Sequence, residues 1–91
     1  MYSQTLPHDT LCPVLELERM ILERTAHYRL FSRRSPHTYY FIEIEYGADY
    51  NAEYVGDDYS SAAKLLQLLQ ENEVTPCTLA DIVQDFRRQN I

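Results

Sequence analysis

Apolar and polar residues alternate with a period of two in two neighbouring segments, residues 27–33 and 39–46. Both segments are rich in aromatic and β-branched side chains, so the pattern is typical of strands that are buried on one face. The five residues between them, 34–38, contain Pro36, which fixes φ and does not belong in a central strand. We therefore expect a β-hairpin with its turn at residues 34–38.

One register of this hairpin separates the apolar pairs from the charged pairs. With Arg33 opposite Tyr39, the pairs on one face are Leu30–Ile42, Tyr28–Ile44 and Ala26–Tyr46. The pairs on the other face are Phe31–Phe41, Arg29–Glu43 and His27–Glu45. A shift by one residue would mix the two sets, because side chains alternate between the faces of a strand. The sequence therefore predicts this register.

The segments on either side of the hairpin are less regular. Residues 14–24 have a composition that suits a helix, but they lead directly into the hairpin, so we interpret them as a strand and keep a helix as the open alternative. Residues 47–51 indicate a turn, and residues 52–55 indicate a short fourth strand whose register stays open. Residues 1–13 show no periodicity and contain two prolines, which indicates an arm of uncertain order.

Two helical patterns complete the chain. The apolar residues of the first, at i, i+3, i+4 and i+7, are Ala62, Leu65, Leu66 and Leu69, with Asp58 or Ser60 as its cap. Residues 72–76 break the pattern. The stripe of the second helix is Leu79, Ile82, Val83 and Phe86, and Thr78 with Asp81 resembles a capping box at its start.

These elements predict one α+β domain over residues 14–91, preceded by the arm at residues 1–13. Its architecture would be an antiparallel meander of three or four strands followed by two C-terminal helices packed on one face. The expected core residues are Tyr28, Leu30, Ile42, Ile44, Leu65, Leu66, Leu69, Leu79, Ile82, Val83 and Phe86.

Residues 72–76 (NEVTP) and 79–86 (LADIVQDF) follow the pattern N-x-V-[ST]-P-x-x-L-x-D-[IV]-V-x-D-F. This pattern resembles the tail of a family of small bacterial proteins of unknown function. The similarity extends back to Tyr28, over about two-thirds of the chain, and does not include the first 25 residues. The resemblance implies a stand-alone bacterial domain and no catalytic residues.

Charge and composition narrow the function. The chain has 91 residues and a net charge of −6, which argues against general nucleic-acid binding through neutralised phosphates. No apolar run approaches the ~18 residues of a membrane span and no signal peptide precedes the domain, so a soluble, cytoplasmic location is expected. Cys12 and Cys77 form no C-x-x-C unit and are expected to be reduced, partly buried thiols.

Sequence motifs for metal binding or catalysis are incomplete or missing. The run Asp49-x-Asn51-x-Glu53 begins like a calcium loop, but the glycine and the final glutamate of such a loop are missing. The three histidines, His8, His27 and His37, fit surface positions better than a metal site. No nucleophile elbow or phosphate-binding glycine loop is present. We therefore expect no catalytic, metal-binding or cofactor-binding residues, and no enzyme.

Eight tyrosines are the unusual feature of the composition, because tyrosine is enriched at interfaces. Our leading hypothesis is a non-enzymatic protein-interaction or regulatory module that binds an unidentified protein partner. A homodimer through the outer sheet face is the favoured cover for Phe31 and Phe41, and the arm at residues 1–13 folding over the same face is the open alternative. The alternative is a small nucleic-acid-associated regulator that uses the arginine-rich hairpin around residues 29–34. The candidate partner-binding residues on the outer sheet face are Arg29, Phe31, Arg33, Tyr39, Phe41 and Glu43.

Overall fold

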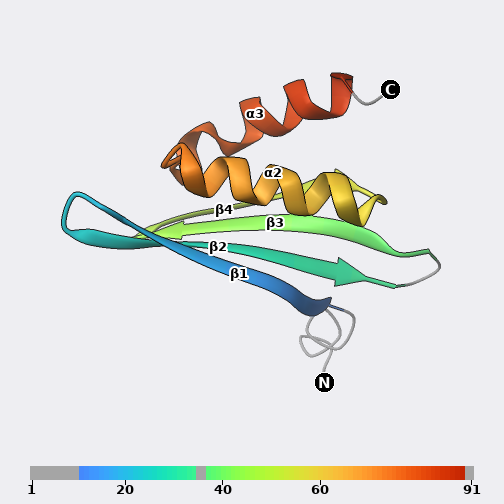
Figure 1. The fold of residues 1–91 in the computed structure, drawn as a ribbon, viewed down its shortest axis with the longest axis horizontal. Helices are drawn as coiled ribbons and strands as arrows, with labels where there is room; N and C mark the ends of the chain where they lie inside the picture. Colours follow the sequence, from blue (N-terminus) through green and yellow to red (C-terminus); the bar gives the residue numbers. More distant parts are fainter. Residues whose placement is uncertain (1–10, 35–36, 90–91) are drawn as a thin grey trace.

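A computed structural model of the chain describes residues 11–34 and 37–89. Its four strands form one antiparallel sheet in the order β1-β2-β3-β4, and two helices follow (Figure 1). The strands are β1 (Leu11–Ile21), β2 (Arg24–Arg33), β3 (Tyr39–Tyr46) and β4 (Asp49–Gly56), and the helices are α2 (Tyr59–Glu71) and α3 (Pro76–Gln89). The predicted α+β meander with two C-terminal helices is confirmed.

The predicted register of the central hairpin is confirmed at every pair. β2 and β3 pair from Ala26 opposite Tyr46 to Arg33 opposite Tyr39. The apolar face lies under the helices, where Leu30 and Ile42 are fully buried. A hairpin register with one buried face is therefore fixed by the side-chain pattern.

The strand interpretation of residues 14–24 is also confirmed, with differences at both ends. β1 begins at Leu11, so part of the segment expected to be an arm pairs with β2, and the rest of that arm lies outside the described residues. Pro13 is tolerated because β1 is an edge strand, and the register shifts immediately after it. The strand ends at Ile21, and Leu22–Glu23 form a two-residue turn.

The fourth strand is longer than predicted. β4 begins at Asp49, so the turn is only Gly47–Ala48, and Asp49, Asn51 and Glu53 belong to a strand instead of a turn. Gly47 has a φ of 62°, the left-handed conformation that lets so short a turn close an antiparallel pair. The expectation of a longer loop was wrong because this turn closes within two residues.

The two helices start differently from one another. Of the two predicted caps of α2, Asp58 is the cap, because its Oδ2 accepts the backbone N–H of Ser61 at 2.9 Å, and Ser60 lies inside the helix. The predicted capping box of α3 is wrong, since that helix already begins at Pro76 and Thr78 lies inside it. Proline is well suited to the first helical turn, because its missing N–H would have no intrahelical acceptor there.

The core lies between the sheet and the helices. α2 packs against β1, β2 and β3, whereas α3 packs mainly against β4. Nine of the eleven expected core residues are buried, but Ile82 and Phe86 are only partly buried, because α3 covers the β4 edge of the sheet instead of its centre. Three further residues are buried that the list of expected core residues did not include: Ala26 and Ala62, which were placed on the apolar face and in the apolar stripe, and the strand residue Val55.

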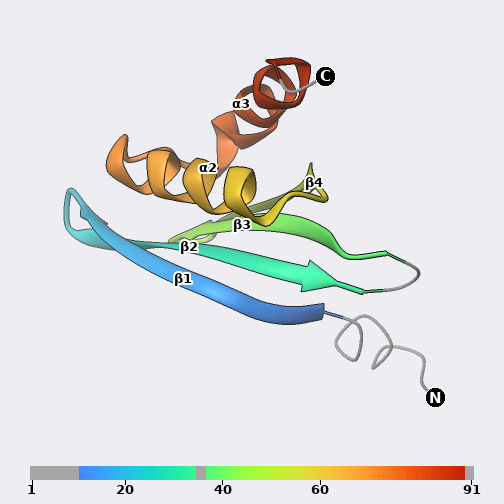
Figure 2. The same ribbon diagram turned by 45° about the vertical axis from the view of Figure 1, so that its right-hand side comes forward.

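Both helices lie on the same side of the sheet, as the two views in Figures 1 and 2 show. No described element covers the opposite side, which we call the outer face. Neither described helix combines the length and the apolar character needed to cross a membrane.

Candidate functional site

The outer face carries side chains from all four strands, and strand alternation decides which ones. In β2 and β3 these are the residues paired with one another on the side away from the helices. The outer-face residues used below are Glu16, Glu18, Met20, His27, Arg29, Phe31, Arg33, Tyr39, Phe41, Glu43, Glu45, Tyr50 and Tyr54. All six candidate partner-binding residues are among them.

Arg29 lies at the centre of the polar part of this face. Its Nη1 donates to Glu43 at 2.7 Å and to Glu45 at 3.0 Å, and its Nε donates to Glu16 at 3.2 Å. The predicted pair with Glu43 is thus present, and two further carboxylates join it. We call Glu16, Glu18, Glu43 and Glu45 the carboxylate cluster; with Arg29 as the cation bonded within it, the group has a formal charge of −3.

The hydrogen bonds within this group shift the pKa values of its members. The bond to Glu43, followed by those to Glu45 and Glu16, raises the pKa of Arg29 above its ordinary value. The Tyr50 hydroxyl donates to the other Glu43 oxygen at 2.7 Å, which raises the pKa of Tyr50 to about 12. Glu43 is the anchor of the network, since only 16% of its side chain is exposed.

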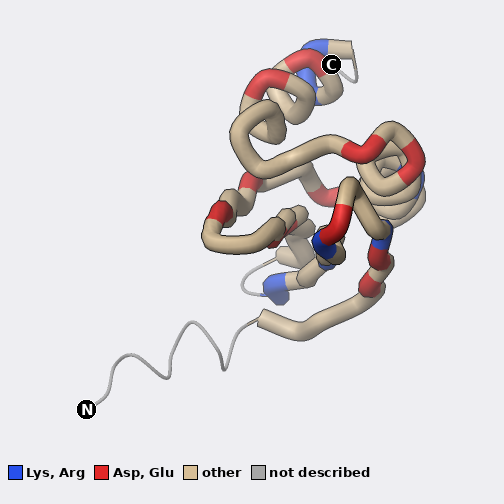
Figure 3. Tube along the Cα trace, turned by 90° about the vertical axis from the view of Figure 1, so that its left-hand side faces the viewer, with Lys and Arg blue, Asp and Glu red and all other residues tan. Residues whose placement is uncertain are grey.

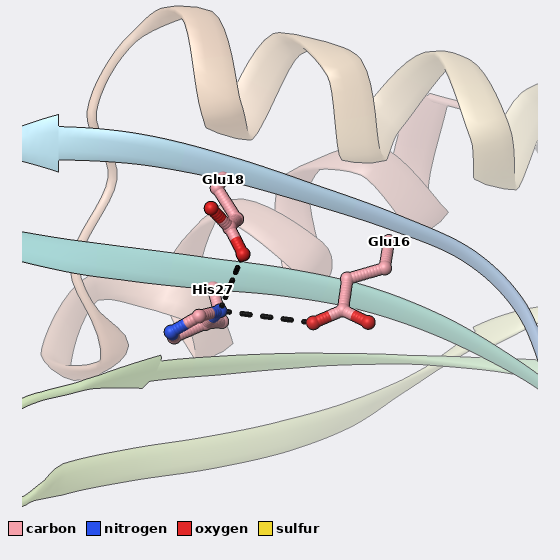
Figure 4. Close-up of side chains that lie close together, drawn as sticks. All are labelled: Glu16, Glu18 and His27. Atoms are coloured by element: carbon pink, nitrogen blue, oxygen red, sulfur yellow. Dashed lines mark ion pairs between the residues drawn. The ribbon is translucent and has the colours of Figure 1, made fainter.

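His27 lies at the β1 side of the same face, between two carboxylates (Figure 4). Its Nδ1 is 3.5 Å from an oxygen of Glu18 and 3.7 Å from an oxygen of Glu16. This nitrogen is shielded from solvent and has no hydrogen-bond partner among the described residues. The arrangement follows from pairing, because Glu18 is directly opposite His27 and Glu16 is two residues away on the same face.

Two carboxylates and an imidazole are donors that zinc and related divalent ions accept. The three ligand atoms lie within 4.8 Å of one another, so these residues could hold such an ion. However, Glu16 also accepts a hydrogen bond from Arg29, and the side chains of Glu16 and Glu18 are 53% and 61% exposed. The same geometry suits ion pairs with a protonated imidazole, and the expectation of no metal site stays a prediction.

An aromatic patch adjoins the carboxylate cluster. We define it as Phe31, Tyr39, Phe41 and Tyr54. The Tyr54 ring centroid lies 5.6 Å from that of Phe41 and 5.8 Å from that of Tyr39, and the Arg87 guanidinium lies 4.9 Å from the Tyr54 centroid. The two phenylalanines predicted to be side by side are cross-strand partners and are half-buried. Tyr54, which was not predicted, is the β4 partner of Phe41.

Charge is distributed unevenly over the outer face. The carboxylate cluster lies on one side of the aromatic patch along the strands, while the exposed Arg33 and Arg34 lie on the other side, at the β2–β3 turn. No ion pair is found for either arginine within the described ranges. Acidic residues also occur elsewhere in the sheet and in both helices (Figure 3). The outer face therefore has an acidic end and a basic end.

Surface depressions elsewhere do not assemble a reactive group. One lies where β4, α2 and α3 meet and is lined by Tyr54, Asp57, Asp58, Ser61 and Arg87 among others. One oxygen of Asp58 is already used to cap α2. Cys12 and Cys77 are free thiols, as predicted, but both are exposed instead of partly buried. Among the described residues we find no nucleophile paired with a histidine.

Sequence reasoning located the central residues of the outer face but missed their neighbours. It paired His27 with Glu45, yet it did not place Glu16 and Glu18 beside them, because residues 14–24 were not registered against the hairpin. The signal was present: glutamates two residues apart in both β1 and β3 must share one face. Tyr50 was missed because its segment was assigned to a turn.

Comparison with known proteins gives a family and no close relative. No curated protein and no solved structure matches the chain. A model described as "Family of unknown function (DUF6514)" matches residues 15–89, which reaches further towards the N-terminus than the resemblance that began at Tyr28. Because this match includes every described strand and helix at least in part, the chain belongs to the DUF6514 family of unknown function.

Proposed function

We propose that this protein is a non-enzymatic protein-interaction module whose docking surface is the outer face of the sheet. The observation that carries the proposal is the aromatic patch on a face that no described element covers. Sheets normally bury such apolar side chains, and aromatic residues are enriched where proteins bind one another. Met20 and Tyr50 extend this surface, since each is 61% exposed.

The electrostatics of the outer face limit what can dock there. Beside the aromatic patch lies the carboxylate cluster, and among the described residues only one guanidinium, that of Arg29, is bonded within it. A complementary protein surface would place an apolar group on the patch and a basic side chain on the cluster. The occupant is therefore expected to be an apolar surface flanked by lysine or arginine.

The alternative, nucleic-acid binding through residues 29–34, has less support. Arg29 is bonded to three carboxylates, and Arg33 and Arg34 are the arginines of this hairpin without an ion pair among the described residues. Two arginines, on a face whose other end is acidic, would neutralise few phosphates. We expect no binding to bulk DNA or RNA at physiological salt, which a salt titration would measure directly.

Site-specific photo-crosslinking in the cells that produce the protein tests the proposal. The photoreactive residue benzoylphenylalanine replaces Tyr39 or Phe41 on the outer face, and replaces Leu68 as the matched control. Leu68 is 54% exposed on α2, on the opposite side of the molecule. We expect discrete, protease-sensitive adducts from Tyr39 and Phe41 and none from Leu68.

Other outcomes would contradict the proposal. Equal adducts from all three positions would mean that contact is non-specific. Absence of adducts from both outer-face positions would remove the outer face as a protein-docking surface. Adducts that disappear on nuclease treatment would establish the nucleic-acid alternative.

A further inference from the structure

We infer that the occupant of the outer face is a second copy of this chain, packed face to face and antiparallel about a twofold axis that crosses the Phe31–Phe41 pair. This inference rests on the proposed docking surface and names its partner. It follows from the order of charges along the strands, from the aromatic patch between them and from the intramolecular use of Arg29.

The outer face is organised in rows that run across the strands. Phe31 opposite Phe41 forms the middle row. Two residues towards the β2–β3 turn, the next row contains Arg33 and Tyr39. Two residues in the other direction, the row contains Glu16, Arg29 and Glu43. Because the rise per residue is about 3.4 Å, both flanking rows lie ~7 Å from the middle row.

A twofold axis along the middle row exchanges the two flanking rows. Two sheets that pack face to face are related by an axis in the plane between them, and an axis across the strands reverses the strand direction. The row with Arg33 of one copy then lies over the row with Glu16, Arg29 and Glu43 of the other copy, and this happens twice. Because such an axis places each strand over its own equivalent, Arg33 lies over Arg29 of the second copy, with Glu16 on one side and Glu43 on the other. An axis along the strands would instead place the carboxylate cluster of one copy, which with Arg29 has a formal charge of −3, over that of the other copy, and the two would repel.

The aromatic patch lies at the centre of this arrangement. Phe31 and Phe41 would face their own equivalents in the second copy, at the ~10 Å spacing of stacked sheets. Half-buried aromatic side chains at the middle of an interface, surrounded by charged pairs, are the usual anchors of protein–protein binding. A second copy that covers these side chains removes apolar surface from water, which the helices do not do because they lie on the other side of the sheet.

The ion pairs of Arg29 within one chain determine which arginine can contact the second copy. The sequence suggested that Arg29 and Glu43 could pair between copies, but the structure joins them within one chain at 2.7 Å. Arg33 is exposed and has no ion pair among the described residues. Arg33 of one copy lies over Arg29 of the other, whose charge is already balanced by its own carboxylates, so Arg33 pairs with Glu16 or Glu43 beside it.

The first test is the solution mass by analytical ultracentrifugation at micromolar concentration. We expect the parent chain to be a dimer. Phe41→Glu should raise the dissociation constant at least ~30-fold, the effect of losing one central anchor. Leu68→Glu, which places the same charge on the exposed side of α2, should leave the dimer intact. A monomeric parent chain would overturn the inference.

The second test is a charge exchange, which also covers the case in which Phe41→Glu does not fold. Arg33→Glu and Glu16→Lys should each weaken the dimer, because each homodimer then has two contacts of like charge. An equimolar mixture of the two variants should form a heterodimer, because both of its contacts pair opposite charges. Circular dichroism establishes that each variant is folded. Failure of the mixture to associate would overturn the twofold register.

Different results would contradict the proposed docking surface and the proposed dimer. If the parent chain is a monomer while Tyr39 and Phe41 still crosslink to another protein, the docking surface stands and the second copy is wrong. If the chain is a dimer that both Phe41→Glu and the charge variants leave unchanged, the interface lies elsewhere, and this inference is wrong.

Discussion

Single residues show how the outer face is held in place. Arg29 is 25% exposed and bridges carboxylates from β1 and β3, so it ties three neighbouring strands together. A partly shielded carboxylate such as Glu43 is unfavourable without its cation, because few water molecules reach it. Arg29 thus stabilises the sheet and also sets the charge of the docking surface.

Replacing Arg29 by methionine should destabilise the fold. We expect the free energy of unfolding to fall by about 1–3 kcal/mol, because charged hydrogen bonds to three carboxylates are lost. Arg88→Met is the control: its ion pair with Asp85 is 68% and 70% exposed, and a change within about 0.5 kcal/mol is expected. Urea denaturation compares the two. Equal effects would show that the Arg29 network adds no more than a surface pair.

Tyr50 should make stability depend on pH at the alkaline end. Its pKa rises from 10.0 to about 12, first because of the bond to Glu43, so the folded state holds the proton more tightly than the unfolded state. That stabilisation is complete below pH 10 and disappears as the pH approaches 12. Tyr50→Phe should lose this dependence, whereas Tyr59→Phe should keep it, which urea denaturation at increasing pH would show.

At the scale of elements, backbone strain occurs in a turn, and most of the buried apolar residues lie where the helices contact the sheet. The β1–β2 turn is unusual, because Leu22 has a φ of 58° and is 88% exposed. Leucine rarely adopts this conformation, since its Cβ approaches the neighbouring carbonyl. The turn forms because the pairing of β1 with β2 on both sides of it leaves room for only two residues.

Leu22→Gly should stabilise the protein by about 0.5–1 kcal/mol, because relief of the left-handed strain exceeds the entropy that glycine loses. Leu22→Ala keeps the Cβ and should give no such gain, although it removes the same exposed apolar atoms. Thermal denaturation of both variants distinguishes strain from exposure. If alanine stabilises as much as glycine, the backbone conformation is not the cause.

Two residues of the apolar stripe of α3 should respond differently to truncation. Leu79 is fully buried, so Leu79→Ala should reduce the free energy of unfolding by ~2–5 kcal/mol. Ile82 is only partly buried, so Ile82→Ala should cost roughly half as much, about 1–2 kcal/mol. The same denaturation experiment measures both, and a larger effect at Ile82 would contradict the observed packing of α3 on β4.

At the scale of the whole molecule, one core joins the sheet and both helices. The Tyr28 hydroxyl donates to the carbonyl of Val74 at 2.8 Å, and Asn51 donates to the carbonyl of Pro76 at 3.3 Å. The segment between α2 and α3 is thereby attached to β2, and the first residue of α3 to β4. Neither helix has a core of its own.

Unfolding is therefore expected to be a single cooperative transition. The helical signal in far-ultraviolet circular dichroism and the tyrosine signal in the near-ultraviolet should change at the same urea concentration. In a dimeric protein the midpoint should also rise with protein concentration, because association stabilises the folded state. Loss of the helical signal before the tyrosine signal would show that the helices separate from the sheet.

The sequence by itself determined the strands of the central hairpin, their register and the apolar stripes of both helices. These features depend on local periodicity: the alternation in β2 and β3 permits only one pairing that buries Leu30 with Ile42 and leaves Arg29 with Glu43 outside. The family resemblance added no residue roles. The placement of six candidate residues on one face also followed from alternation alone.

Only the tertiary structure decided which residues and elements surround these six candidate residues. The length of β4 and the start of α3 depend on turns that close within a few residues, which composition does not fix. The partial burial of Ile82 and Phe86 depends on α3 lying over β4, a choice between two apolar surfaces that periodicity cannot make. Arg29 bonds to Glu16 as well as Glu43 because β1 pairs with β2, and such non-local pairing is set by the packed sheet and not by any single segment.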